Sequence, residues 1–201
     1  MILSVGYVIL LPCRKYIIYD RIMRFEKVHI MLIAVTGTPG TGKSSACKLL
    51  SEFIVIDLNE LIKRHANLFQ SDAERDSLEV DPKHLKKLLP KMKGTLIIEG
   101  HLAHLLDPDI TIVLRCSPKT LGKRLSLRGW SDKKIRENQE AEAVDVILIE
   151  AMNSKAMVFE IDTSKMKPKG VADAIREIIA GERRKYKPGN IDWSKEVLAW
   201  Y

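Results

Sequence analysis

The chain has 201 residues, of which 46% are hydrophobic and 29% are charged, and its formal net charge is +7. This length suits one well-packed domain and excludes two of ordinary size, while the composition excludes a low-complexity or collagen-like protein. The basic excess suits a ligand that carries phosphate groups, RNA included, and a solvated basic surface explains it equally well.

The first thirty residues differ in character from the rest. Residues 2–11 form an apolar run that is shorter than the roughly 20 residues needed to span a bilayer, and no basic segment precedes it as in a signal peptide. We therefore expect no membrane partner. Residues 1–30 are interpreted as an N-terminal extension outside the functional fold, with a structured N-terminal segment as the alternative, and the functional domain is expected at 31–201.

The cysteines are Cys13, Cys47 and Cys116. They lie far apart and show neither the paired spacing of a zinc site nor that of a disulfide framework. This usage is typical of a reducing compartment, so a cytoplasmic location is expected.

After residue 30, apolar runs of strand length alternate with helical patterns. The expected strands are 31–36, 53–57, 95–99, 110–115 and 157–161. Strands that alternate with helices form βαβ units, and nearly continuous β-branched runs indicate burial on both faces of the sheet. The predicted fold is a three-layer α/β fold, with a five-stranded parallel sheet and helices on both faces.

Capping residues and apolar spacing mark the helices. Asp81-Pro82 and Ser117-Pro118 each place a capping side chain before a proline at the first helical position. One long helix is predicted over 132–153, and a last helix at about 170–180. The buried face of the long helix would consist of apolar residues at helical spacing: Ile135, Ala141, Val144, Ile147, Leu148 and Ala151.

The segment that follows the first expected strand is rich in glycine. Residues 37–44, GTPGTGKS, match G-x-x-x-x-G-K-[ST] at every fixed position. Glycines let successive backbone N–H groups converge on a phosphate, and the next helix points its positive end at the same anion. Lys43 would contact the β- and γ-phosphates, and the Ser44 hydroxyl would ligate Mg²⁺. The motif therefore predicts a nucleoside triphosphate site.

Polar residues follow two further strands. Glu99 ends the third expected strand, where phosphate-loop enzymes place an acid that holds Mg²⁺ directly or through water. His101 is close enough to touch an attacking group or water, with a backbone hydrogen bond at the strand end as the alternative. Asp57 ends the second strand and would orient the acceptor or a metal-bound water, with capping of the next helix as the alternative.

Two segments favour a small kinase among phosphate-loop proteins, and the N-K-x-D motif of GTPases is absent from the sequence. Residues 57–83 are long, charged and free of glycine, as expected of a helical flap over an acceptor. Residues 128–136 form a cationic turn between two expected helices, and such a lid would bring Arg128 over the transferring phosphoryl group. A solvated charged surface is the alternative for each segment.

With these motifs in order, the chain resembles the adenylate kinase isoenzyme 6 family, which includes archaeal adenylate kinases and the eukaryotic nuclear ATPase/kinase linked to small-subunit ribosome assembly. The matching pieces are GTPGTGKSS at 37–45, VLR at 113–115, RGW at 128–130, KIRENQEAE at 134–142 and VILIEA at 146–151.

The resemblance implies ATP and Mg²⁺ as cofactors, an acceptor-binding flap at about 54–77 and a lid at about 127–137. It implies that one set of residues binds the ATP phosphates and that Arg128 contacts ATP from the lid. That set is Gly40, Gly42, Lys43, Ser44 and Ser45. Eukaryotic relatives end the third strand with Asp-x-His, whereas Glu99-Gly100-His101 here keeps the acid and the histidine but lengthens the carboxylate.

The leading hypothesis is reversible phosphoryl transfer from Mg·ATP to AMP, giving two ADP, with other nucleoside monophosphates also accepted and a role in small ribosomal subunit maturation. No general base is required because the acceptor phosphate is already anionic. Lys43, Mg²⁺ and Arg128 would supply the positive charge.

The alternative is an ATPase that acts as a ribosome-assembly factor, with kinase activity minor and His101 orienting water. A small-subunit ribosomal protein or rRNA would then be the partner. The basic, aromatic C-terminal tail would either contact that partner or pack back on the domain through its tryptophans. Its candidate residues are Arg183, Arg184, Lys185, Tyr186, Lys187 and Trp193.

Overall fold

The computed structural model describes residues 31–65, 70–72, 77–79, 81–90 and 93–200. The expected N-terminal extension, residues 1–30, and parts of the expected acceptor flap lie outside the described residues. All elements below belong to one compact unit, which the described residues of 31–90 and 95–200 form.

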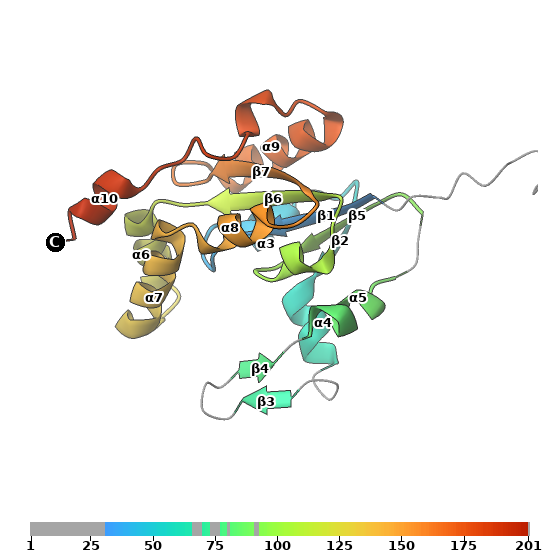
Figure 1. The fold of residues 1–201 in the computed structure, drawn as a ribbon, viewed down its shortest axis with the longest axis horizontal. Coiled ribbons are helices and arrows are strands. Elements are labelled where there is room, and N and C mark those ends of the chain that lie inside the picture. The colour runs from blue at the N-terminus through green and yellow to red at the C-terminus, as the bar shows by residue number, and fades with distance from the viewer. Residues whose placement is uncertain (1–30, 66–69, 73–76, 80, 91–92, 201) are drawn as a thin grey trace, which may run out of the picture. The chain divides into compact units, whose positions relative to one another are not determined.

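Five parallel strands form the central sheet (Figure 1). They are β1 (Met31–Thr36), β2 (Ile54–Asp57), β5 (Thr95–Glu99), β6 (Ile110–Arg115) and β7 (Met157–Asp162). Their order is β2-β5-β1-β6-β7, and each neighbouring pair is parallel. Every residue of β6 is buried, including the polar Thr111 and Arg115, as expected of a central strand covered on both faces. The prediction of a five-stranded parallel sheet is confirmed.

Helices cover both faces of this sheet (Figure 1). On one face, α3 (Lys43–Cys47) and α9 (Pro168–Ala180) bury their apolar residues against Ile112 and Leu114 of β6. On the other face, α8 (Val146–Met152) packs against Val113 of the same strand. Successive side chains of a strand point to opposite faces, so β6 serves both layers. The predicted three-layer arrangement is confirmed.

Two helix starts predicted from capping residues are confirmed. The Asp81 carboxylate accepts a hydrogen bond from Lys83 N at 2.8 Å and begins α5 (Pro82–Lys87). The Ser117 hydroxyl accepts from Thr120 N at 3.3 Å and begins α6 (Pro118–Ser126). Short helical segments complete the described elements: η2 (Ala103–Leu106), η3 (Arg184–Tyr186) and α10 (Ser194–Leu198).

The single long helix predicted over 132–153 is wrong. The segment forms α7 (Asp132–Ala143) and α8, with a break at Val144 and Asp145. Asp145 has a φ of +58°, which an α-helix cannot contain, and its carboxylate accepts a hydrogen bond from buried Arg115. Val144, expected in the core, is 63% exposed, whereas Glu142 is 3% exposed. Pairing with a buried arginine therefore decides where this helix ends.

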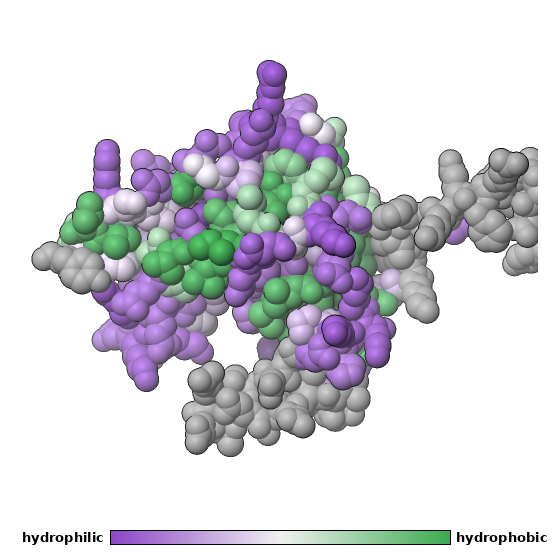
Figure 2. Space-filling model, viewed as in Figure 1, coloured by the Kyte–Doolittle hydropathy of each residue, from purple (hydrophilic) through white to green (hydrophobic). Residues whose placement is uncertain are grey.

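The surface differs over these two helices. Figure 2 shows a hydrophilic surface over α7 and an apolar one over α8, where Val146, Ile149 and Met152 are exposed. Among the described residues, no helix combines the length and the apolar character needed to cross a bilayer.

The helical flap predicted over 57–83 is only partly helical. Its described residues form α4 (Leu58–Arg64) and the start of α5, with an antiparallel pair between them, β3 (Gln70–Asp72) and β4 (Ser77–Glu79). A short turn joins α6 to α7, as expected of the segment that contains Arg128.

Candidate active site

The carboxyl ends of the strands meet at one edge of the sheet. β1 lies between β5 and β6, and the chain passes from one side of β1 to the other after β5. In open α/β sheets, ligands bind at such a point of reversal, outside the carboxyl ends of the strands. The glycine-rich loop follows β1 at this point, and Asp57 lies opposite Glu99 in the register of β2 and β5.

All three glycines of the loop, Gly37, Gly40 and Gly42, have a positive φ that other residues rarely adopt. Gly37 has a φ of +135°, and a Cβ at this position would lie 2.3 Å from the carbonyl oxygen of Leu114. Gly42 precedes α3 with a φ of +102°, and a Cβ there would meet no atom within 4 Å. Gly37 thus lets the loop pack closely on β6, whereas Gly42 turns the chain into α3 beside open space.

Lys43 is 8% exposed and folds back over its own loop. Its Nζ donates hydrogen bonds to the carbonyl oxygens of Gly37 at 2.6 Å and Thr38 at 3.2 Å. Burial lowers the pKa of Lys43 to about 8; the Glu99 carboxylate opposes this shift, and Arg128 adds to it. The ammonium group is therefore held among carbonyl groups at the base of the site, where an anionic ligand would stabilise its charge.

Glu99 is 3% exposed, and its Oε2 has no hydrogen-bond partner among the described residues. Burial raises the pKa of this carboxyl, the Ser44 hydroxyl opposes the shift, and nearby Asp57 adds to it. In the described part of the chain, no cluster of three His, Cys, Asp or Glu side chains could hold a metal. Mg²⁺ is usually bound through one or two protein oxygens, substrate phosphates and water, so Ser44 and Glu99 fit this ion.

Two pockets flank the loop. One, of 290 Å³, is lined by Lys43, Ser44, Asn59, His101, Arg128 and Trp130 among others. The other, of 370 Å³, lies against Arg124, Leu127, Arg128, Thr163, Met166 and Pro168. Gly40, Gly42 and Ser45 line both pockets, and so does the exposed Arg128. The loop and this arginine therefore stand between two spaces that could each hold part of a nucleotide.

His101 and Asp57 lie where the sequence placed them, at strand ends. His101 lines the 290 Å³ pocket, and its pKa is lowered by burial, by Lys43 and by His104, which favours the neutral form of its ring. Its carbonyl oxygen accepts a hydrogen bond from the Thr36 hydroxyl at 3.2 Å. The Asp57 carboxylate caps α4 by accepting from Asn59 N at 2.9 Å and Glu60 N at 3.2 Å, which is the alternative stated for it.

Sequence reasoning missed the residues that close the second pocket. Arg124, on α6, donates to the carbonyl oxygens of Thr163 at 2.8 Å and Gly40 at 3.4 Å. The Thr163 hydroxyl donates a hydrogen bond to the carbonyl oxygen of Thr41, and the two oxygen atoms are 2.8 Å apart. Thr163 could have been found from its place just after the last strand, β7. Because the strands are parallel, they all end at the same edge of the sheet, and a polar residue there is a candidate for the site.

Three comparisons relate the chain to known proteins. Residues 33–145 match the family described as AAA domain. Proteins named "Putative adenylate kinase" from Archaeoglobus fulgidus and Methanocaldococcus jannaschii are 45% and 39% identical to the chain. The first alignment covers 83% of this chain and 94% of the relative, and the second covers 84% and 96%.

Among solved structures, shikimate kinase from Acinetobacter baumannii in complex with shikimate superposes with a TM-score of 0.53. The two chains are 15% identical, and the match covers 77% of this chain and 96% of that one. At this identity the likeness concerns the fold alone.

Proposed function

The chain belongs to the family of the archaeal proteins named "Putative adenylate kinase", and from this premise we propose that it is a nucleoside-monophosphate kinase that converts Mg·ATP and AMP into two ADP. Membership makes it a phosphotransferase. The observation that carries the finer proposal is that Arg128 lines the pockets on both sides of the phosphate loop. In this proposal one cation would border both the space for the nucleoside of ATP and the space for the reacting phosphates.

In this proposal the pocket bordered by Thr163 and Pro168 receives the nucleoside of ATP, and the pocket bordered by Asn59 and His101 receives the reacting phosphates. The first N–H groups of α3 have no acceptor within the helix, so Lys43, Ser44 and Ser45 offer them to the phosphates, beside Gly40 and Gly42 of the loop. Lys43 would exchange its two carbonyl partners for phosphate oxygens.

Positioning and charge neutralisation suffice for this reaction because the acceptor phosphate is already anionic. Ser44 and Glu99 would hold Mg²⁺, which neutralises charge on the β- and γ-phosphates. Arg128 would neutralise charge on the transferring group from the lid, residues 127–137. Asp57, already engaged as a helix cap, would contribute by fixing α4 beside the acceptor. Other nucleoside monophosphates would be accepted if the flap contacts the base weakly.

The second candidate function is ATP hydrolysis coupled to small-subunit ribosome maturation. His101 favours it, because a neutral imidazole beside Lys43 can orient a water molecule. A separate hollow of 550 Å³ also favours it, since its lining includes Arg183, Arg184, Lys185 and Lys187, which suit the phosphates of rRNA. Two aromatic residues of the same tail contact the domain and are not free for a partner. Tyr186 is 8% exposed, and the centre of the Trp200 ring lies 4.4 Å from Cζ of Arg136 in α7.

The test is ADP formation from Mg·ATP by the purified protein, with and without AMP. We expect AMP-dependent formation of two ADP per ATP. Lys43→Ala should lower turnover roughly 10²–10³-fold or more, because it removes a charge aimed at the transferring phosphoryl group. Lys155→Ala, which removes an exposed lysine outside both pockets, is the matched control. ADP and free phosphate released at a rate indifferent to AMP would mean that water is the acceptor, and the ATPase would replace the kinase.

A further inference from the structure

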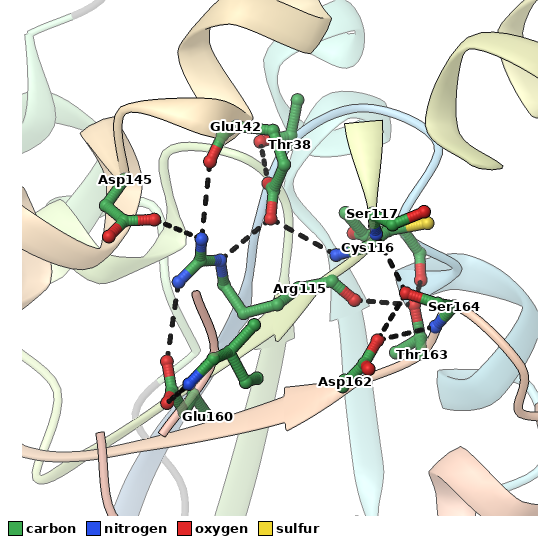
Figure 3. A network of polar contacts seen from close by, with 12 residues as sticks. Thr38, Arg115, Cys116, Ser117, Glu142, Asp145, Glu160, Asp162, Thr163 and Ser164 are labelled. Carbon is green, nitrogen blue, oxygen red and sulfur yellow. Dashed lines mark hydrogen bonds and ion pairs between the residues drawn. The ribbon is translucent and has the colours of Figure 1, made fainter. Parts of the chain in front are cut away.

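A buried carboxylate joins α7 to the phosphate loop (Figure 3). Glu142 is 3% exposed, and its Oε2 accepts a hydrogen bond from the Thr38 hydroxyl at 2.6 Å. Its Oε1 accepts from Arg115 Nε at 2.7 Å and from Cys116 N at 3.1 Å. One side chain therefore links α7, whose first residues belong to the proposed lid, with the end of β6 and the second residue of the loop.

Stability alone is a weak reason for this arrangement. Arg115 is 1% exposed and is paired with three carboxylates, those of Glu142, Asp145 and Glu160 (Figure 3). Buried ion pairs are about as stabilising as apolar residues of similar volume, because desolvation offsets their attraction. Such a network does fix geometry, since a charged group left without its partner in the interior is costly.

Thr38 is the point at which this network reaches the loop. Its hydroxyl is bonded to Glu142, and its carbonyl oxygen accepts from Lys43 Nζ at 3.2 Å and from Thr41 N at 3.2 Å. Thr38 is 3% exposed and lines neither pocket, so a nucleotide would not touch it. Its orientation nevertheless sets the turn of the loop and the resting position of Lys43.

We propose that Glu142 is a positioning residue for phosphoryl transfer, acting through the Thr38 hydroxyl to hold the phosphate loop in register with α7 and with the lid that includes the start of this helix. The inference rests on the proposed function and names residues that act on its site without touching substrate. A rigid link of this kind aligns Lys43 and Arg128, which come from distant parts of the chain, on one phosphoryl group.

The test removes the link without removing the charge network. Thr38→Val keeps the shape of the side chain and deletes the hydroxyl, while Arg115 retains its three carboxylates. We expect kcat to fall roughly tenfold, since small misplacements cost up to about 10²-fold, whereas Kd for Mg·ATP, measured by calorimetry, changes less than about threefold. Thr38→Ser, which keeps the hydroxyl, should restore kcat to within about twofold of the unmodified protein.

Thr111→Val is the matched control. Thr111 is likewise a buried threonine, but its hydroxyl has no hydrogen-bond partner among the described residues. Loss of this hydroxyl should leave kcat unchanged. Hydrogen exchange of the amides in 37–42 should accelerate in Thr38→Val and not in Thr111→Val, which reports on the loop independently of activity.

Glu142→Gln and the double variant Thr38→Val/Glu142→Gln complete a double-mutant cycle, which measures whether the two side chains contribute to kcat independently. If the two side chains act as a unit, the double variant loses no more kcat than the worse single variant. Unchanged kcat in a folded Thr38→Val protein would overturn the inference. An equal loss of kcat in Thr38→Ser, or additive losses of kcat in the cycle, would overturn it as well.

If the unmodified protein hydrolyses ATP at a rate that does not depend on AMP, the kinase proposal fails. The same variants, compared by their rates of ATP hydrolysis and of hydrogen exchange, still decide this inference.

Discussion

Glu99 is the residue at which stability and the proposed chemistry oppose one another. Its carboxyl group lies at the end of β5, 3% exposed, with Oε2 unpartnered among the described residues. Because its pKa is raised in the folded chain, chiefly by burial, the charged form is less favourable there than in the unfolded chain. A fold gains nothing from such a charge, whereas a Mg²⁺ site requires it.

We predict that Glu99→Gln is more stable than the unmodified protein at pH 7 and a poorer enzyme. The Glu99 carboxylate lowers the free energy of unfolding by its full amount only above the pKa that Glu99 has in the folded chain. This loss vanishes as the pH falls below the pKa of Glu99 in the unfolded chain, so the stability difference between the variant and the unmodified protein should shrink toward acid pH. Urea unfolding without nucleotide or metal at pH 7 and near pH 4 measures this difference. The Mg²⁺ concentration for half-maximal turnover should rise roughly 10–100-fold.

The matched control is Glu182→Gln, which neutralises an exposed glutamate in the C-terminal tail. It should change neither the free energy of unfolding nor the Mg²⁺ requirement by a measurable amount. A Glu99→Gln protein that is destabilised at pH 7, or that needs no more Mg²⁺ than the unmodified protein, would remove Glu99 from the metal site.

Among the elements, the turn between α6 and α7 contains Arg128, the cation of the proposed lid. Arg128 is exposed there, and the neighbouring Trp130 ring lies 4.5 Å from Lys134 Nζ. We predict that Arg128→Ala lowers kcat roughly 10²–10³-fold, because in the proposed mechanism it removes positive charge where charge develops in the transition state. Mg·ATP affinity should weaken much less, since the loop and Lys43 remain. Steady-state kinetics with calorimetric titration separates the two effects.

Lys133→Ala controls for general loss of positive charge, since Lys133 is exposed in the first turn of α7 and lines neither pocket. It should leave kcat within about twofold of the unmodified value. Equal losses in the two variants would mean that the net charge of the lid matters, and an unchanged kcat in Arg128→Ala would refute its role.

Elements were predictable where the signal lies in consecutive residues. The strands and the phosphate loop are contiguous, so β-branched runs and the fixed glycines reveal them. The end of α7 was not predictable, because Glu142 is polar and an apolar repeat treats it as solvent-facing. Its partner Arg115 lies 27 positions earlier in the chain. The second pocket was missed for the same reason: Arg124 and Thr163 meet only after the sheet forms.

Over the whole molecule, the C-terminal tail is tied to the elements that form the proposed site. Glu160 of β7 accepts from Asn190 N at 2.8 Å and pairs with Arg115 through its other oxygen. Farther along, the Glu196 carboxylate accepts from Lys119 N at the start of α6. The tail therefore contacts the network that reaches Thr38. We propose on this ground that the functional domain extends from residue 31 through the tail and unfolds cooperatively as one unit.

That unit should not require residues 1–30. All five strands of the central sheet, its apolar core and the lining of both pockets come from residues beyond position 30. We predict that a chain beginning at Met31 keeps kcat/KM within about twofold and shifts Tm by less than the roughly 2–4 °C that 1 kcal/mol produces in a chain of this size. A chain beginning at Val35 is the control: it lacks Ile33 and Ala34, which are at most 1% exposed in the central strand, and should not fold. Calorimetry and the AMP-dependent assay measure both chains. Loss of folding or of activity in the chain that begins at Met31 would show instead that residues 1–30 are part of the functional domain.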